Sequence, residues 1–307
     1  MLVYSLKRFG YMLLSLFIIT TATFFMMHSI PGNPLGELAK QLPQQTIDLY
    51  EEAYGLNKPV PEQYGIFLKN LVTKGDLGAS IRYPGRSVTE TITSTAPISA
   101  RLGIQALAVG IPIGIIFGII AALFRGKAPD YIVSVLAIIG VTIPVFVLAS
   151  IFQYFFAVKL GWVPTSGWGR PIHTVLPTLA MCFGSIATYA RYMRSNILEV
   201  LGQDYILTAE AKGVSRFMVV VKHVLRNAIL PVITIIGPQV AAIFTGSFIV
   251  ERMFNIPGLG FYYVNSIQMH DYPMIIGTTV FYAALFIFSQ FIVDLLYGVV
   301  DPRIRLS

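Results

Sequence analysis

The chain has 307 residues, of which 55% are hydrophobic and only 12% charged, and its formal net charge at pH 7 is +7. A typical soluble domain carries about 25% charged residues, so this composition argues against an ordinary soluble enzyme. The basic residues fall mostly between long apolar stretches, which predicts a membrane protein with basic loops rather than a nucleic-acid-binding protein. The single cysteine, Cys182, excludes an internal disulfide.

Six stretches free of Asp, Glu, Lys and Arg are long enough to cross a hydrocarbon core, which requires about 20 residues. They are residues 9–36, 102–124, 131–158, 171–190, 227–250 and 272–293. A seventh uncharged stretch, residues 253–270, contains polar and helix-breaking residues such as Asn255 and Pro257, which lipid tolerates poorly. We therefore predict an all-α integral membrane protein with six transmembrane helices, and a loop or re-entrant segment at 253–270.

The distribution of basic residues predicts the orientation of these helices. If the N-terminus is cytoplasmic, the inner segments carry twelve Lys and Arg residues and the short outer segments carry three. Basic residues concentrate on the cytoplasmic side of membrane proteins. We therefore expect both termini to lie in the cytoplasm.

The first external segment, residues 31–96, is too long for a simple connection between helices. Within it, residues 46–54 and 63–72 have the pattern of short amphipathic helices, so the segment is predicted to form an external cap. The predicted organisation is residues 1–95 as first helix and cap, 96–300 as a five-helix core, and 301–307 as a cytoplasmic tail.

Two features inside the predicted spans concern how the helices pack and bend. Gly110, Gly114 and Gly118 recur every four residues, and small residues at this spacing allow close helix packing, within this chain or against a partner subunit. Pro144 interrupts the third span, where proline can produce either a fixed bend or a hinge. We expect packing at the three glycines, and we regard Pro144 as the best hinge candidate.

The sequence lacks the residue patterns of a catalytic, metal or cofactor site. It contains neither a His-Glu-x-x-His motif nor a phosphate-binding Gly-x4-Gly-Lys-Ser/Thr loop, and His270-Asp271 is predicted to be a solvated pair in an external loop. No Ser/Lys or paired-Asp constellation suggests a membrane enzyme, and the uncharged spans argue against an ion-gradient-driven secondary transporter. If transport is driven by ATP, a separate subunit must hold the nucleotide.

The cytoplasmic loop at residues 195–227 is the most informative part of the chain. We predict that the fourth helix continues to Gly202 and that Asp204 N-caps a new helix, which ends at Gly213 in a left-handed conformation. Ser215 is predicted to N-cap a second helix that runs to Arg226. Both helices carry apolar residues that need a covering surface: Ile206, Leu207, Val214, Phe217 and Met218. The spacing of these apolar residues is compatible with two covering surfaces, anionic lipid or the cleft of a protein.

Glu210-Ala211, followed by Gly213 and a basic helix, resembles the EAA loop by which ABC importer permeases dock into their ATPase subunits. Further segments are similar to the B-type permeases of the oligopeptide/dipeptide branch of this family. They are Ile30-Pro-Gly-Asn-Pro34, Gly75-Asp-Leu-Gly-Ala-Ser80, Asn255-Ile-Pro-Gly-Leu-Gly260 and Asp301-Pro-Arg303. The resemblance extends over essentially the whole chain.

The resemblance implies a type I importer fold and a non-catalytic permease subunit, in a bacterial cytoplasmic membrane, that imports dipeptides or oligopeptides. It implies a second homologous permease, two cytoplasmic ATPases and an extracytoplasmic peptide-binding protein as partners, and no cofactor. Import of nickel, glutathione or a short sugar by the same machinery is the alternative. The residues implied to couple the permease to the ATPase are Asp204, Tyr205, Ala209, Glu210, Ala211, Lys212, Gly213, Ser215 and Arg216.

Overall fold

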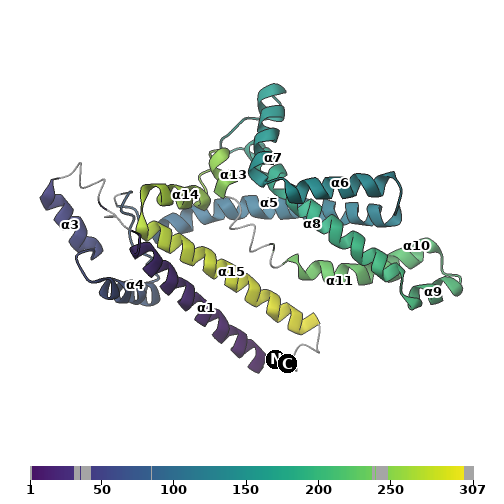
Figure 1. Cartoon of the computed structure of the whole chain (residues 1–307), viewed down its shortest axis with the longest axis horizontal. Coiled ribbons are helices and arrows are strands. Elements are labelled where there is room, and N and C mark those ends of the chain that lie inside the picture. Colours follow the sequence, from purple (N-terminus) through teal and green to yellow (C-terminus); the bar gives the residue numbers. More distant parts are fainter. Residues whose placement is uncertain are drawn as a thin grey trace. The chain divides into compact units, whose positions relative to one another are not determined.

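The computed structural model describes residues 2–30, 35, 43–83, 85–236, 239 and 248–300. These residues form helices joined by turns, apart from one isolated β-bridge between Ala79 and Ser87. They divide into two compact units (Figure 1): one comprises the chain up to Ser99 together with the chain from Pro257 onward, and the other comprises Ala100–Ile256. Among these residues, five helices are long and apolar enough to span a membrane, or six if one bent pair counts as a single span.

In the first unit, two long helices lie side by side and carry the cap at one end (Figure 1). The long helices are α1 (Leu2–His28) and α15 (Tyr272–Val300). The two amphipathic helices predicted in the cap are confirmed as α3 (Gln44–Tyr54) and α4 (Val60–Lys74). The segments 31–34 and 301–307, which contain parts of the predicted motifs and the cytoplasmic tail, lie outside the described residues.

The stretch 253–270 is more regular than a loop. Residues Leu259–Met269 form helix α14, which begins after Gly258 and ends at His270. At 11 residues this helix is about 16 Å long, roughly half the thickness of a hydrocarbon core. The polar and glycine residues therefore interrupt the segment before α14 without preventing a short helix, and the expectation that it does not span is unchanged.

Asp271 is fully buried, so the prediction of a solvated His270-Asp271 pair is wrong for the aspartate. Its carboxylate accepts hydrogen bonds from the Ser80 hydroxyl and from the backbone N–H groups of Ile81 (3.2 Å) and Met274 (3.4 Å). Asp271 directly precedes α15, where an acidic side chain satisfies free N–H groups of the first helical turn. The same carboxylate thus fixes the 80–82 loop to the start of α15.

The second unit is built around α8 (Val175–Leu201), which is contacted by several other helices. They include α5 (Val88–Leu123), α6 (Ala128–Thr142), α7 (Val145–Phe152) and the short η2 (Pro171–Thr174) and α13 (Phe248–Met253). A π-helical segment, η1 (Gln153–Lys159), continues α7. Helix α5 begins at Val88 rather than near Leu102, because the predicted span covered only its uncharged part. The residues of α5 up to Ser99 belong to the first unit.

The three glycines of α5 all face α8. A Cβ atom at Gly110, Gly114 or Gly118 would lie 2.8, 2.7 or 2.6 Å from a Cβ atom of α8, closer than real Cβ contacts. Gly140 of α6 makes an equally close approach to another part of α8, where a Cβ would lie 2.7 Å from that of Ala187. Small residues let helices approach until their backbones touch, which strengthens van der Waals packing in lipid.

The third span is sharply broken at Pro144. Helix α6 ends at Thr142, Ile143 is extended (φ −83°, ψ 123°), and Pro144 N-caps α7, so that the axes of α6 and the α7–η1 helix differ by 109°. Proline disfavours the helical conformation of the residue before it, which accounts for the break at Ile143. The described conformation therefore contains a bend at this proline.

Replacing Gly114 with alanine tests the close packing of α5 on α8. The added methyl group would meet Tyr189 Cβ at 2.7 Å and the Ile186 carbonyl oxygen at 2.8 Å, so the helices must separate. We expect a loss of roughly 1–3 kcal/mol in the free energy of unfolding, measured by denaturant titration in detergent micelles. Gly10→Ala is the matched control, because a Cβ there meets no atom within 4 Å. Equal stability of the two variants would contradict the packing argument.

Candidate functional site

The candidate site begins where α8 ends. Gly202 follows the last residue of α8, the chain turns, and helix α9 (Asp204–Ala211) begins after Gln203. The N-cap is therefore Gln203 rather than Asp204, one residue earlier than predicted, and it makes no side-chain capping bond. Asp204 instead lies in the first helical turn, where its negative charge interacts favourably with the positive end of the helix dipole.

A glycine corner separates α9 from the next helix. Gly213 has φ +77°, and its N–H donates to the Glu210 carbonyl oxygen at 2.9 Å, as predicted for a left-handed end of the helix. No atom lies within 4 Å of a Cβ built at this position, so the requirement for glycine is conformational and not steric. Ser215 then N-caps the second helix by accepting a hydrogen bond from Met218 N–H at 3.4 Å.

The second helix is longer than predicted and does not end at Arg226. Three consecutive helical segments run from Arg216 to Thr234: α10 (Arg216–Met218), the π-helical η3 (Val219–Leu225) and α11 (Arg226–Thr234). The predicted boundary between the loop and the fifth span, at Arg226, therefore lies inside one continuous helical run. Neither glycine nor proline interrupts this run before Pro231. Of the predicted span, residues 237, 238 and 240–247 lie outside the described part of the chain.

One side of this corner is anchored to α8. Ile206 of α9 is 1% exposed and packs in a buried cluster with Tyr189, Met193 and Ile197 of α8 and with buried residues of η3 and α11. Side-chain hydrogen bonds reinforce the contact: Asn196 Nδ2 donates to the Ala228 carbonyl oxygen at 3.2 Å, and Asn227 Nδ2 donates to the Tyr205 hydroxyl at 3.1 Å. Apolar packing thus fixes the corner to α8, while the two hydrogen bonds tie α11 to α8 and to α9.

The other side of the corner is exposed and partly apolar. Phe217 is 76% exposed and Leu207 is 60% exposed. We call the exposed apolar set Tyr205, Leu207, Phe217 and Met218 the corner surface. The apolar residues predicted to form one face therefore belong to two surfaces. Ile206 is buried in the cluster with α8 and Val214 packs against that cluster, whereas the others are exposed. The exposed charged residues Glu210, Lys212 and Arg216 lie in the same helices and turn, beside the corner surface.

An ion pair without a local signal in the sequence joins α6 to α8. Arg194 donates from Nε and Nη2 to the two carboxylate oxygens of Asp130, at 2.6 and 2.9 Å, and Gly126 N–H donates to the same carboxylate at 2.9 Å. Asp130 is only 4% exposed. The bidentate pair thus connects the helix that carries the corner to the first turn of α6 and to the loop before it.

The structure brings all nine residues implied to act in coupling into this one corner. The three glycines of α5 meet α8 at Ser185, Tyr189 and Met193, and the last two of these also belong to the cluster that buries Ile206. Ala209 packs against the buried cluster. The other eight are exposed or, like Gly213, form the turn itself. Pro144 lies in a separate element, at the break between α6 and α7.

Comparison with known families decides the class of the protein. The family described as binding-protein-dependent transport system inner membrane component matches residues 114–306, and the corresponding N-terminal family matches residues 1–102. The chain belongs to this family. It is accordingly an all-α, multi-pass permease subunit of the inner membrane, and members of the family act as membrane components of ABC importers with ATPase and binding-protein partners.

Relatives of known name match along the whole chain. The dipeptide transport system permease protein DppB of Bacillus subtilis is 46% identical over 305 residues, covering 99% of this chain and 98% of the relative. The oligopeptide transport system permease protein OppB of Haemophilus influenzae is 39% identical over 307 residues, covering 99% of this chain and all of the relative.

Two solved transporters show the same type of fold. One is an amino acid ABC transporter crystallised with histidines, with a TM-score of 0.54, 16% identity and coverage of 70% of this chain and 94% of that chain. The other is the MetNI methionine ABC transporter in an inward-facing conformation, with a TM-score of 0.51, 20% identity and coverage of 70% and 96%. At this level of identity the likeness supports the type I importer fold.

Replacing Asp130 with asparagine tests the pair between α6 and α8. Loss of the carboxylate removes the charge that the Arg194 guanidinium binds, so we expect a loss of roughly 2–3 kcal/mol in the free energy of unfolding. The measurement is denaturant titration in micelles. Glu62→Gln is the control: its pair with Lys58 (2.8 Å) is solvent-exposed, and its loss should cost less than about 1 kcal/mol. A smaller effect at Asp130 than at Glu62 would refute this role.

Proposed function

We propose that the chain is one of two homologous membrane subunits of an ATP-driven importer of dipeptides or oligopeptides. The support for the cargo is the full-length similarity to DppB of Bacillus subtilis and OppB of Haemophilus influenzae. In this proposal, ATP is hydrolysed on two cytoplasmic ATPase subunits, and an extracytoplasmic protein delivers the peptide. The chain itself supplies a path for the peptide and a mechanical connection, not a catalytic group.

The observation that carries the coupling part of the proposal is the two-sided corner at residues 204–226. Its buried side packs on α8 through Ile206, and the Asn196 hydrogen bond ties α11, which continues from it, to α8, while its corner surface has no covering element among the described residues. An exposed apolar surface beside charged residues is typical of a protein interface. We place the ATPase on the corner surface.

Movement of the corner would be transmitted along α8 to the rest of the second unit. The glycine contacts join α8 to α5 and α6, and the Asp130–Arg194 pair joins it to the start of α6. Helices packed this closely move as a group, because their interfaces transmit displacement with little deformation. The break at Pro144 is the proposed position at which the third span changes angle during transport.

The proposed organisation places both termini and the corner in the cytoplasm, with the cap of α3 and α4 outside the membrane. The first helix with the cap (residues 1–95) would receive the peptide-binding protein, and the helices of residues 96–300 would form half of the translocation path. The other half would come from the second permease.

Replacing Phe217 with serine tests the corner surface. This side chain is 76% exposed, so its loss should leave folding unchanged but remove an aromatic contact with the ATPase. We expect the variant to recover at least fivefold less ATPase by affinity purification from mildly solubilised membranes, as loss of an aromatic anchor costs about 1 kcal/mol or more. Trp162→Ser, at a residue 66% exposed in a different loop, is the control and should recover as much ATPase as the unaltered chain. Absence of any ATPase from the unaltered complex would refute the proposal.

Replacing Gly213 with valine tests the corner itself. A β-branched residue at φ +77° is strained, so the two helices should meet at a different angle. We expect ATP hydrolysis without proportionate peptide uptake, measured together in proteoliposomes. Gly161→Val is the matched control, because Gly161 has φ +64° and equal free space but lies in a loop outside the corner. If both variants lost the same fraction of uptake per ATP hydrolysed, the role of the corner would be disproved.

A further inference from the structure

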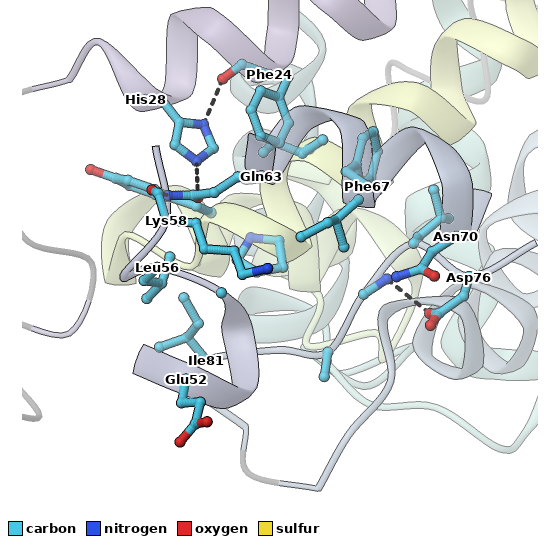
Figure 2. Close-up of a pocket in the computed structure, with 18 residues that line it drawn as sticks. Phe24, His28, Glu52, Leu56, Lys58, Gln63, Phe67, Asn70, Asp76 and Ile81 are labelled. Carbon is cyan, nitrogen blue, oxygen red and sulfur yellow. Dashed lines mark hydrogen bonds between the residues drawn. The ribbon is translucent and has the colours of Figure 1, made fainter. Parts of the chain in front are cut away.

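The first unit contains a cavity of about 730 Å³ in the cap (Figure 2). Its walls come from the end of α1, from α3 and α4, from the two loops at 55–58 and 76–81, and from the first turn of α15. All of these elements belong to the same compact unit. The volume lies in the range of sites that bind small organic ligands, roughly 300–1,000 Å³.

Much of the cavity wall is apolar and aromatic. Phe24 stacks on His28, with ring centroids 4.1 Å apart, and on Phe67 at 5.6 Å. Leu56, Ile66, Leu77 and Ile276 extend this apolar surface. A wall of this kind accepts an apolar or aromatic side chain of a ligand.

Charged groups of both signs lie around the apolar wall. In Figure 2 the side chain of Lys58 extends beneath Gln63 toward the middle of the cavity, while the carboxylates of Glu52 and Asp76 lie at its lower and right-hand edges. The Lys58 ammonium group also donates to Glu62 at 2.8 Å, and one oxygen of Asp76 accepts a hydrogen bond from Gly78 N–H at 2.9 Å. The cavity therefore offers a cation and two anions in different places.

The walls are held in position by hydrogen bonds. Gln63 Nε2 donates to the Lys58 carbonyl oxygen at 2.8 Å, and Gln63 Oε1 lies 3.1 Å from His28 Nε2, which ties α4 to the end of α1 and to the turn that carries Lys58. On the opposite side, buried Asp271 binds the backbone N–H of Ile81. A cavity fixed in this way binds a ligand without a large ordering cost.

We infer that this cavity binds a short peptide with free termini, a step of the import proposed above on which the inference rests. The peptide carboxylate pairs with Lys58, the α-amino group pairs with Glu52 or Asp76, and an apolar side chain lies against Phe24 and Phe67. A hydrocarbon chain of a lipid would match the apolar wall but would form no ion pair with the charged groups of both signs around it. A peptide with free termini and an apolar side chain matches both the charged groups and the apolar wall.

The test is equilibrium binding of tritiated alanyl-phenylalanine to the permease–ATPase complex in lipid nanodiscs, without the binding protein, which would itself take up peptide. We expect saturable binding by the unaltered complex. Ile66→Trp, which fills the cavity from α4, and Lys58→Gln, which removes the cation, should each weaken binding at least about tenfold. The matched controls are Val72→Trp and Lys69→Gln on the same helix, at exposed residues that do not line the cavity, and they should bind as the unaltered complex does.

A peptide with an amidated carboxyl group tests whether Lys58 binds the carboxylate. Amidation of the peptide carboxyl group should weaken binding to the unaltered complex at least about tenfold but should cause no further loss in Lys58→Gln, because the two changes remove one interaction. Full additivity of the two changes would overturn the assignment of Lys58 to the carboxylate.

Uptake measured with the complete system separates this inference from the proposed function. If the system imports the dipeptide but the complex shows no saturable binding, or if Ile66→Trp and Val72→Trp bind equally well, the inference is overturned and the proposed function stands. A lipid that co-purifies with the unaltered complex and is absent from Ile66→Trp, with no peptide binding, also overturns it. If the complete system imports no peptide, the proposed function fails and the inference fails with it.

Discussion

At three successive turns of α5, the residue that faces α8 is a glycine: Gly110, Gly114 and Gly118. The rest of the second unit depends on this close approach, because it brings the backbones of two long helices together where larger residues would hold them apart. Gly140 does the same for α6, and the Asp130–Arg194 pair then fixes the end of α6 to α8. The helix that continues into the corner is therefore held by its neighbours along much of its length.

Features that depend on local chemistry could be predicted from the sequence. A glycine between two helical segments predicted the left-handed corner at Gly213, a serine before a basic helix predicted the cap at Ser215, and the repeat of glycines predicted a packing surface. These signals work because the backbone conformation or helix periodicity involved spans only a few residues. The same reasoning predicted the two cap helices, although it placed their starts two or three residues late.

Features that depend on distant parts of the chain could not be predicted in this way. Asp130 and Arg194 are 64 residues apart, and Asp271 binds a loop about 190 residues away, so neither side chain has a local signal for its partner. The start of α5 was predicted too late for a different reason. A stretch free of charged residues marks only the part of a helix that suits lipid, whereas α5 extends beyond that part to Val88. The apolar face of the corner was predicted as one surface, but only its packing on α8 reveals which residues remain exposed.

The distribution of charge on the corner distinguishes its two possible occupants. A helix resting on a membrane has one apolar face and basic residues on the other, which anionic lipid attracts. Helix α9 instead carries two exposed carboxylates, Asp204 and Glu210, and no basic residue, and the face that holds Ile206 is already covered by the chain itself. Tyr205 and Leu207 lie in the helix of these carboxylates, whereas Phe217 and Met218 directly follow Arg216 and lie near Lys212 in the sequence, so the corner surface is flanked by charges of both signs. A protein cleft can match such a mixed surface residue by residue, which favours the ATPase over the membrane as the partner of the corner surface.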